Sequence, residues 1–328
     1  MRLLRLEEGD SVSLTDDLTH DIPPYAILSH TWGARGEEVT FQDIQNKDFQ
    51  QKPGYGKILF CGRQAQLDGL EYFWVDTCCI DKTSSAELAE SINSMYRWYE
   101  NAHKCYVYLS DVSINFDRNT PPLLSSWLHG FRKSRWFKRG WTLQELVAPQ
   151  VVEFFSSNGQ KLGDKTSLEE PIHNITNIPA PSLRDFSQSN IDLKTIFSWC
   201  QNRETTRPED KVYSLLGLVG VSMPVIYGEG EGSAFLRLCA EVLQRDPKQG
   251  QSLLMFVTEI GHAPALRILV RGKENIESKN DNGNSLLALA ASNGHEAVIR
   301  MLLDKTKKKL RPTPLENLWK SALKGGLT

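Results

Sequence analysis

The sequence is poor in cysteine and in excess charge of either sign, and each shortage excludes a class of protein. Its 328 residues hold six scattered cysteines without Cys-x-x-Cys spacing: Cys61, Cys78, Cys79, Cys105, Cys200 and Cys239. This pattern predicts neither a disulfide scaffold nor a zinc module. Basic residues number 38 and acidic residues 40, so the formal charge is 38 − 40 = −2. Such a balance predicts no general attraction to nucleic acid or to an anionic membrane.

Long apolar runs and a leader segment are also missing. No stretch approaches the ~20 apolar residues that cross a bilayer. The first residues, Met-Arg-Leu-Leu-Arg-Leu-Glu-Glu, turn acidic before the apolar core of a signal peptide can form. The sequence therefore predicts a soluble, cytoplasmic protein with reduced thiols and without nucleic-acid or membrane partners.

Four short apolar segments predict buried strands, at residues 25–29, 72–76, 105–110 and 151–155. Each is rich in aromatic or β-branched residues and is followed by polar residues or glycine, as in strands covered on both faces. A helical pattern over residues 85–102 begins with a capping box from Ser84 to Glu87. This alternation predicts an α/β domain over residues 1–160, a parallel sheet with helices on both faces.

The following part, residues 161–250, predicts a helical extension packed on the sheet. Residues 173–192 are rich in Pro, Ser, Asn and Asp and predict a long connecting segment. Helical patterns follow around residues 193–201, 207–219 and 231–244. The second of these follows another apparent capping box, from Thr206 to Glu209.

The last part, residues 251–328, contains a repeat. Residues 261–270 recur as residues 294–303, an offset of 33 residues, and both copies begin with Gly-His. This period and the order of turn, helix, Gly-His and helix are typical of ankyrin repeats, which bind proteins. About one and a half repeats are visible in the sequence, whereas roughly three repeats are needed to bury a stable core. Either the helical extension caps these repeats, or the chain stops short of a longer array. The pattern predicts a helix pair at residues 285–292 and 295–304, with Gly294 in the turn and three residues facing inward: Leu289, Val298 and Leu302.

Polar clusters follow the predicted strands, at residues 29–33 and 76–81, and a third lies at residues 139–146. In a parallel α/β sheet, ligands bind at the carboxyl ends of the strands. The first two clusters are therefore expected to meet at one edge of the sheet.

Four ordered blocks, at residues 25–33, 74–81, 85–95 and 139–146, resemble the signature of the fungal heterokaryon-incompatibility (HET) domain. Residues 205–217 and 227–230 resemble the segment that commonly follows that domain. The resemblance implies a role in fungal self/non-self recognition, in which the domain triggers the death of incompatible fused cells. Members of this family often carry sensor repeats after the domain.

The order of these blocks is also similar, more distantly, to that of Toll/interleukin-receptor (TIR) domains, which implies a TIR/flavodoxin-like sheet. Some TIR domains cleave NAD at the nicotinamide–ribose bond with a glutamate whose counterpart here is Glu145. Because nicotinamide leaves as a neutral molecule, one carboxylate that stabilises an oxocarbenium-like transition state can suffice. The resemblance implies that NAD is a substrate, that there is no resident cofactor or metal, and that Glu145 is the catalytic residue. The residues that it implies for substrate binding are Ser29, His30, Trp32, Gly33, Asp76, Cys78 and Trp141.

Each candidate residue also has a purely structural interpretation. Glu145 could be a surface glutamate or a partner of Arg139, and Asp76 could cap the loop that follows it. Trp32 and Trp141 could be core residues. Cys78 with His30 would suggest thiol chemistry, but buried cysteines are usually inert.

Three functions are consistent with these patterns. The chain could be an incompatibility effector that hydrolyses NAD. It could instead be a non-enzymatic module that assembles partners, including further copies of itself, through the HET domain. In the third interpretation the ankyrin segment defines the role, and the α/β domain is its scaffold. Fold alone cannot separate them, because function depends on sites.

Overall fold

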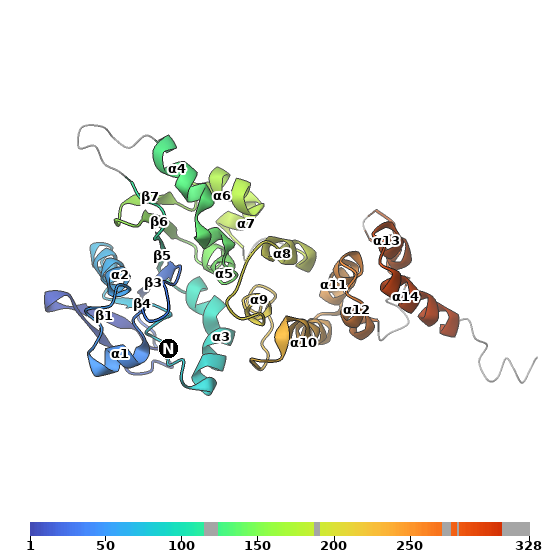
Figure 1. The fold of residues 1–328 in the computed structure, drawn as a ribbon, viewed down its shortest axis with the longest axis horizontal. Helices are drawn as coiled ribbons and strands as arrows, with labels where there is room; N and C mark the ends of the chain where they lie inside the picture. The colour runs from blue at the N-terminus through green and yellow to red at the C-terminus, as the bar shows by residue number, and fades with distance from the viewer. Residues whose placement is uncertain (115–123, 187–190, 271–276, 281, 310–328) are drawn as a thin grey trace, which may run out of the picture. The chain divides into compact units, whose positions relative to one another are not determined.

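The computed structural model describes residues 1–328 with the exception of 115–123, 187–190, 271–276, 281 and 310–328 (Figure 1). The chain forms two compact units, residues 1–191 with 195–234 and residues 192–194 with 235–328. The sequence predicts three domains with boundaries at residues 160 and 250, and these boundaries stay a prediction. The structure groups most of the helical extension with the sheet. Parts of the predicted ankyrin region lie outside the described residues.

Within the described residues, the first unit is built on a seven-stranded sheet in the order β2-β1-β4-β3-β5-β6-β7. The strands are β1 (Leu4–Glu7), β2 (Ser11–Leu14), β3 (Tyr25–His30), β4 (Tyr72–Trp74), β5 (Lys104–Leu109), β6 (Val152–Ser156) and β7 (Lys161–Asp164). The four predicted strands are the central ones, and they pair in parallel. The α/β class is confirmed.

Three further strands, which the sequence did not predict, pair antiparallel at the two sides of this parallel centre. Strand β1 pairs antiparallel with both β2 and β4, and β7 pairs antiparallel with β6. Strands β1, β2 and β7 have four residues each, and β1 alternates buried and exposed positions. A short strand buried on one face has no continuous apolar run, so the sequence does not mark it as a strand.

The helices of the first unit begin and end as follows: α1 (Phe41–Asn46), α2 (Tyr55–Leu67), α3 (Ser85–Glu100), α4 (Leu124–Lys133), α5 (Thr142–Val147), α6 (Glu169–Thr176), α7 (Ala180–Arg184) and α9 (Asp210–Tyr213), with 3-10 turns η1 (Glu8–Asp10) and η2 (Arg135–Lys138). Helices α8 (Leu193–Cys200) and α10 (Gly230–Arg245) each contain residues of both units. No described helix is long and apolar enough to span a bilayer.

Helices cover both faces of the sheet, as predicted. Consecutive strand residues point to opposite faces. Phe73 of β4 lies against Gly62 of α2, where an added Cβ atom would be 3.0 Å from the ring. Its neighbour Trp74 packs on Tyr99 of α3, with ring centroids 6.1 Å apart. Helices α2 and α3 therefore lie on opposite sides.

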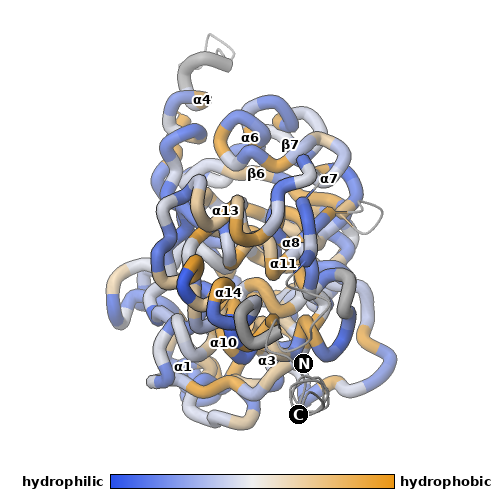
Figure 2. Tube along the Cα trace, turned by 90° about the vertical axis from the view of Figure 1, so that its right-hand side faces the viewer, coloured by the Kyte–Doolittle hydropathy of each residue, from blue (hydrophilic) through white to orange (hydrophobic). Residues whose placement is uncertain are grey.

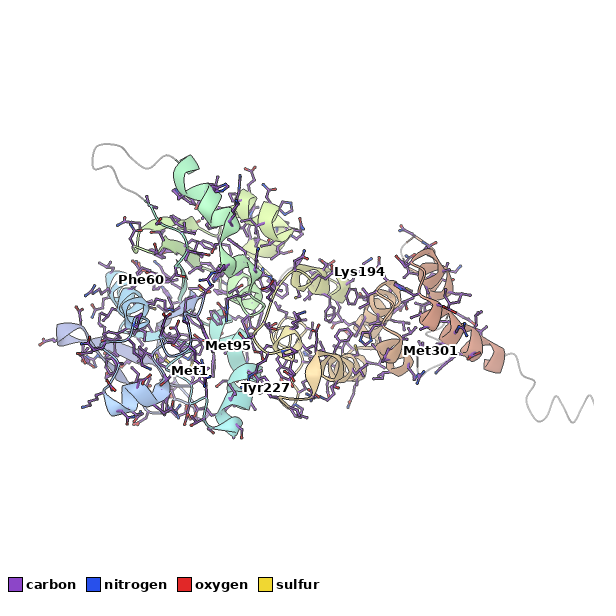
Figure 3. All side chains as sticks on the ribbon, viewed as in Figure 1. Met1, Phe60, Met95, Lys194, Tyr227 and Met301 are labelled. Atoms are coloured by element: carbon purple, nitrogen blue, oxygen red, sulfur yellow. The ribbon has the colours of Figure 1, made fainter. Side chains whose placement is uncertain are left out.

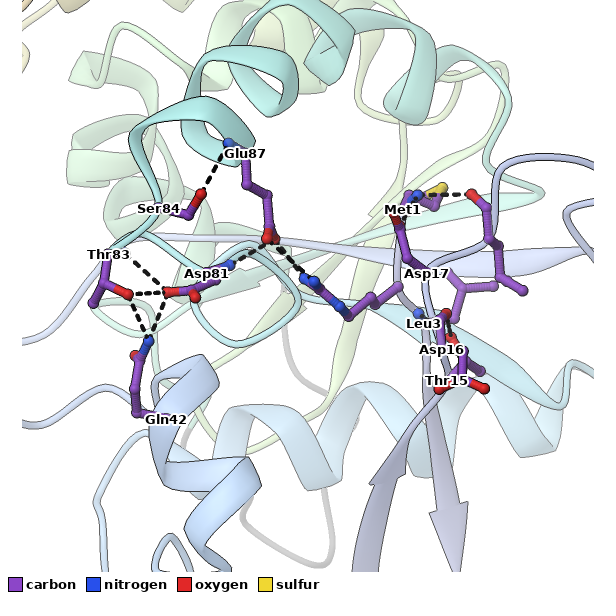
Figure 4. A network of polar contacts seen from close by, with 12 residues as sticks. Met1, Leu3, Thr15, Asp16, Asp17, Gln42, Asp81, Thr83, Ser84 and Glu87 are labelled. Atoms are coloured by element: carbon purple, nitrogen blue, oxygen red, sulfur yellow. Dashed lines mark hydrogen bonds and ion pairs between the residues drawn. The ribbon is translucent and has the colours of Figure 1, made fainter.

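Helix α3 begins as the sequence predicts, but only half of the capping box forms. The Ser84 hydroxyl accepts from the Glu87 amide at 3.3 Å, whereas the Glu87 carboxylate accepts from the Asp81 amide at 2.8 Å (Figure 4). The same carboxylate accepts two hydrogen bonds from Arg2, at 2.5 and 3.2 Å. Glu87 thus ties the N-terminal segment and the loop after β4 to the start of α3.

Two expectations for the helical extension were wrong. Residues 173–192 are not only a connection, because α6 and α7 occupy much of the segment. Over residues 207–219, α9 spans only Asp210–Tyr213. The predicted capping box is not formed there, because Glu209 accepts instead from the amides of Gly228 and Gly230, at 2.8 and 2.9 Å.

The second unit contains stacked helix pairs, as the repeat predicts. Its helices include α11 (Pro247–Glu259), α12 (Ala263–Leu269), α13 (Leu286–Ser292) and α14 (Glu296–Lys309). Helix α11 contacts α13 and α12 contacts α14, while Gly294 has a φ of +71° in the turn between α13 and α14. Figure 2 colours the helices of this unit by hydropathy, and α14 contains both hydrophobic and hydrophilic residues.

The inward residues of this pair differ slightly from the prediction. Val298 and Leu302 are buried, but Leu289 is only half-buried because α13 turns Leu286 and Ala290 inward. The helix pair itself is confirmed.

A close contact between Gly217 and Tyr96 of α3 yields a test of this packing. A Cβ atom at Gly217 would lie 2.0 Å from the Cβ atom of Tyr96, whereas one at Gly56 in α2 meets nothing within 4 Å. Gly217→Ala should lower the free energy of unfolding by ~1–3 kcal/mol through overpacking. Gly56→Ala should raise it by ~0.5–1 kcal/mol. Equal denaturation midpoints for the two variants would contradict this packing.

Candidate functional site

A pocket of about 230 Å³ lies at the carboxyl ends of β3 and β4. This is the edge at which the sequence predicts the polar clusters to meet. One wall is apolar and comes from α3 and the loop before it: Ile80, Leu88, Ile92 and Met95. Helix α5 and residues 204–227 complete the pocket, and Figure 3 labels two lining residues, Met95 and Tyr227.

Glu145 of α5 lines this pocket with a buried and tightly held side chain. Its carboxyl group accepts a hydrogen bond from the Ser29 hydroxyl at the end of β3. Ser29 is fully buried, and its oxygen accepts in turn from the indole Nε1 of Trp136 at 2.7 Å. Trp136, Ser29 and Glu145 therefore form a hydrogen-bond chain, which fixes the carboxyl group in place.

Burial raises the pKa of Glu145 to about 8. The hydrogen bond from Ser29 opposes this shift, the negative charge of Asp76 adds to it, and the positive charges of two nearby arginines oppose it. At neutral pH the carboxyl group is therefore largely protonated, and a cation placed beside it would favour its ionised form. Glu145 is not the surface glutamate of the structural interpretation, since only 9% of it is exposed.

Arg203 is one of these arginines, and it is buried. Its guanidinium group donates to the carbonyl oxygen of Arg139 at 3.0 Å and to the hydroxyl of Thr142 at 2.9 Å. Burial lowers its pKa to about 10, so it remains charged at neutral pH. Arg203 thereby joins the segment after α8 to the start of α5.

Asp76, two residues after the end of β4, faces side chains of the pocket. Its carboxylate accepts from Trp32 Nε1 at 3.0 Å and lies 3.7 Å from Lys82 Nζ. Lys82 also lies 3.9 Å from the centroid of the Trp32 ring, a cation–π contact. Burial opposes ionisation, but the positive charges of Lys82 and Arg139 and the hydrogen bond from Trp32 outweigh it and lower the pKa of Asp76. This residue therefore carries a negative charge in the pocket.

His30 lines the same pocket beside two carboxylates. Its Nε2 atom lies 3.9 Å from Asp76 and 3.8 Å from Glu38, and its side chain is 1% exposed. Burial lowers its pKa to about 4, so the ring is neutral at pH 7. Within the described part of the chain, neither ring nitrogen has a hydrogen-bond partner.

The structure brings most of the predicted site residues together. His30, Trp32, Asp76, Trp141 and Glu145 line the pocket, and Ser29 lies behind Glu145. The remaining two do not line it. The Gly33 amide donates to Glu38 at 2.6 Å. Cys78 is fully buried, its Sγ lies 3.9 Å from the Val75 carbonyl, and burial raises its pKa well above the ordinary value, which gives no thiolate nucleophile.

Sequence reasoning missed several pocket residues. Arg207 stacks 3.8 Å from the Tyr227 ring, and the Tyr227 hydroxyl donates to Asp210 at 2.9 Å. All three belong to the extension whose sequence resembles the segment after the HET domain, and that resemblance was the one available signal. No described cluster of three His, Cys, Asp or Glu residues is arranged to hold a metal ion.

The pKa of Glu145 gives a direct spectroscopic test. Its carbonyl stretch should be present at pH 6.5 and lost by pH 9.5, with a midpoint near 8, in infrared difference spectra. The band should be missing from Glu145→Gln. Asp76→Asn should move the midpoint to lower pH, because the Asp76 charge raises the pKa of Glu145. A carbonyl band that is the same at pH 6.5 and at pH 9.5 would contradict a pKa of about 8 for Glu145.

Comparisons with known proteins agree with these observations. Residues 25–124 match the family model of the heterokaryon incompatibility protein (HET), and residues 228–312 match the model of ankyrin repeats in three copies. The chain is 49% identical over 247 residues, 75% of its length, to the vegetative incompatibility protein HET-E-1 of Podospora anserina, and the match covers 18% of that protein. No solved structure matches the chain. The resemblances to the HET domain and to ankyrin repeats are confirmed: the chain belongs to the heterokaryon-incompatibility family, with a HET domain followed by ankyrin repeats.

Proposed function

We propose that this chain is an effector of heterokaryon incompatibility and that its HET domain hydrolyses NAD at the nicotinamide–ribose bond. The family and the printed name of HET-E-1 support the first part. The observation that carries the second is the buried Glu145 carboxyl group, held by Ser29 in a pocket with aromatic and cationic side chains. A TIR-like reaction and cytoplasmic action belong to this proposal.

The proposed reaction needs one well-placed carboxylate. The electron pair of the bond between ribose C1′ and the pyridinium nitrogen leaves with nicotinamide, which becomes neutral. The positive charge then develops on the ribose as an oxocarbenium ion, and water adds to C1′ with loss of a proton. Glu145 in its ionised form stabilises that charge, and the low dielectric of the buried site strengthens the attraction.

The charge of the substrate fits the pKa of Glu145. In the empty pocket the carboxyl group is largely protonated at pH 7, because its pKa is about 8. A bound pyridinium cation favours the carboxylate and lowers that pKa. A pKa near the operating pH also lets the same group take up a proton from the attacking water.

The other side chains suit the rest of a nicotinamide nucleoside. Trp32 is 40% exposed and offers a ring face, and Trp141 lines the pocket one helical turn before Glu145. The ionised carboxylate of Asp76 is an acceptor for ribose hydroxyl groups. His30 is neutral and does not repel the cationic ring.

A non-enzymatic module is the second candidate, and the ankyrin helices favour it. Ankyrin repeats bind proteins, and Leu287 and Leu303 on α13 and α14 are 38% and 40% exposed. In that case the HET domain would act by assembling with partners or with a second copy of itself, and the pocket would take no part.

Nicotinamide release separates the two candidates. Purified protein incubated with NAD should release nicotinamide, and Glu145→Gln should release it at least ~100-fold more slowly, the effect of losing one electrostatic contact in the transition state. Thermal stability should change little, because Gln keeps the shape and the acceptor for Ser29. Glu90→Gln, an exposed change on α3, is the matched control and should keep full activity.

Two results would contradict the enzymatic proposal. One is wild-type protein that releases no nicotinamide under conditions in which it triggers cell death. The other is Glu145→Gln protein with wild-type turnover. Either result would favour the non-enzymatic module.

A further inference from the structure

A second hollow of about 270 Å³ adjoins the Glu145 pocket and has a basic lining. Both share Trp32, Arg139 and residues 204–206. Arg135 and Lys138 occur only in the second hollow. Its charged lining side chains are three cations, Arg135, Lys138 and Arg139, and one carboxylate, Glu204, so its formal charge is 3 − 1 = +2. The whole chain carries −2, so this basic lining does not follow from a generally basic surface.

The backbone presents these cations on one side. In a 3-10 helix the side chains at positions i and i+3 are aligned, so Arg135 and Lys138 of η2 point to the same side. Between them, Trp136 and Phe137 are buried and anchor the turn in the core. Arg139 follows in extended conformation and its backbone pairs with Glu204. An anchored basic turn requires little ordering when an anion binds.

The cations are weakly neutralised within the protein. Arg135 lies 3.8 Å from Asp111, whose carboxylate already accepts from Ser134 and from the Arg135 amide, each at 2.8 Å. In the described part of the chain, no carboxylate lies within 4.0 Å of the Lys138 or Arg139 side chain. Both remain available to phosphate oxygens, for which Arg and Lys are the usual ligands in proteins.

We propose that this basic hollow binds the diphosphate group of the substrate. This assignment rests on the proposed function, since it places the diphosphate next to the nicotinamide nucleoside in the Glu145 pocket. The substrate class is then a dinucleotide or a nucleotide with a diphosphate, rather than a nucleoside. Trp32 and Arg139 lie on the boundary that the two hollows share.

Binding measurements without turnover test the assignment. Inorganic pyrophosphate, ADP-ribose and nicotinamide riboside are titrated by calorimetry against the wild type and the double variant Arg135→Gln/Lys138→Gln. Because nicotinamide riboside carries the scissile bond, its titrations are made with both proteins in the Glu145→Gln background. The Kd of pyrophosphate and of ADP-ribose should rise at least ~10-fold in the variant, with a weaker dependence on salt, whereas the Kd of nicotinamide riboside should stay the same. Lys138→Gln alone, an exposed change, serves if the double variant does not fold.

Arg132→Gln/Lys133→Gln is the matched control. This control removes one arginine and one lysine charge, as the test variant does, but from α4, outside both hollows. It should leave the affinities for all three ligands unchanged. Equal weakening in this control, or no pyrophosphate binding by the wild type, would overturn the assignment. If pyrophosphate binds as expected but NAD is not hydrolysed, the subsite stands and the enzymatic proposal fails. If NAD is hydrolysed and the double variant keeps its pyrophosphate affinity, only the subsite fails.

Discussion

The hydrogen-bond chain from Trp136 through Ser29 to Glu145 is the interaction on which the pocket depends. It joins the end of the central strand β3 to η2 and α5, which lie 107 and 116 residues away in sequence. All three side chains are buried, so a broken link would leave an unpaired polar group at a cost of about 1–3 kcal/mol. The sheet, the aromatic core and the candidate catalytic group are therefore positioned together.

The charges around this chain follow from the same burial. Taking Glu145 out of water raises its pKa, whereas Asp76, close to Lys82, stays ionised. Two carboxyl groups of one pocket thus have different protonation states at neutral pH, which is a common feature of acid–base sites. Arg203 adds a buried positive charge that also fixes the start of α5.

Much of the fold could be predicted from the sequence because the central strands are buried on both faces. Continuous apolar runs identify β3, β4, β5 and β6, and the carboxyl-end rule places residues 29–33 and 76–81 at one edge. The edge strands were missed because they are short and half-exposed. The capping box at Thr206 was misassigned because Glu209 binds amides about 20 residues away, at Gly228 and Gly230.

The candidate site was predicted less completely, for a related reason. Residues next to strand ends, such as Asp76, are marked by local sequence. Trp136, Arg207 and Tyr227 reach the site through contacts between distant segments, and no local pattern encodes those contacts. The TIR resemblance indicated Glu145 as catalytic and Ser29 as substrate-binding, but it did not indicate that Ser29 and Trp136 hold the glutamate in place.

The most direct test of the account is a crystal structure of the Glu145→Gln variant with NAD bound. We expect the ribose C1′ atom to lie within about 4 Å of the side-chain carboxamide at position 145, close enough for electrostatic stabilisation of the ribose. The Ser29 hydroxyl should still contact that side chain. NAD bound elsewhere, or a C1′ atom more than about 10 Å from position 145, would contradict the account.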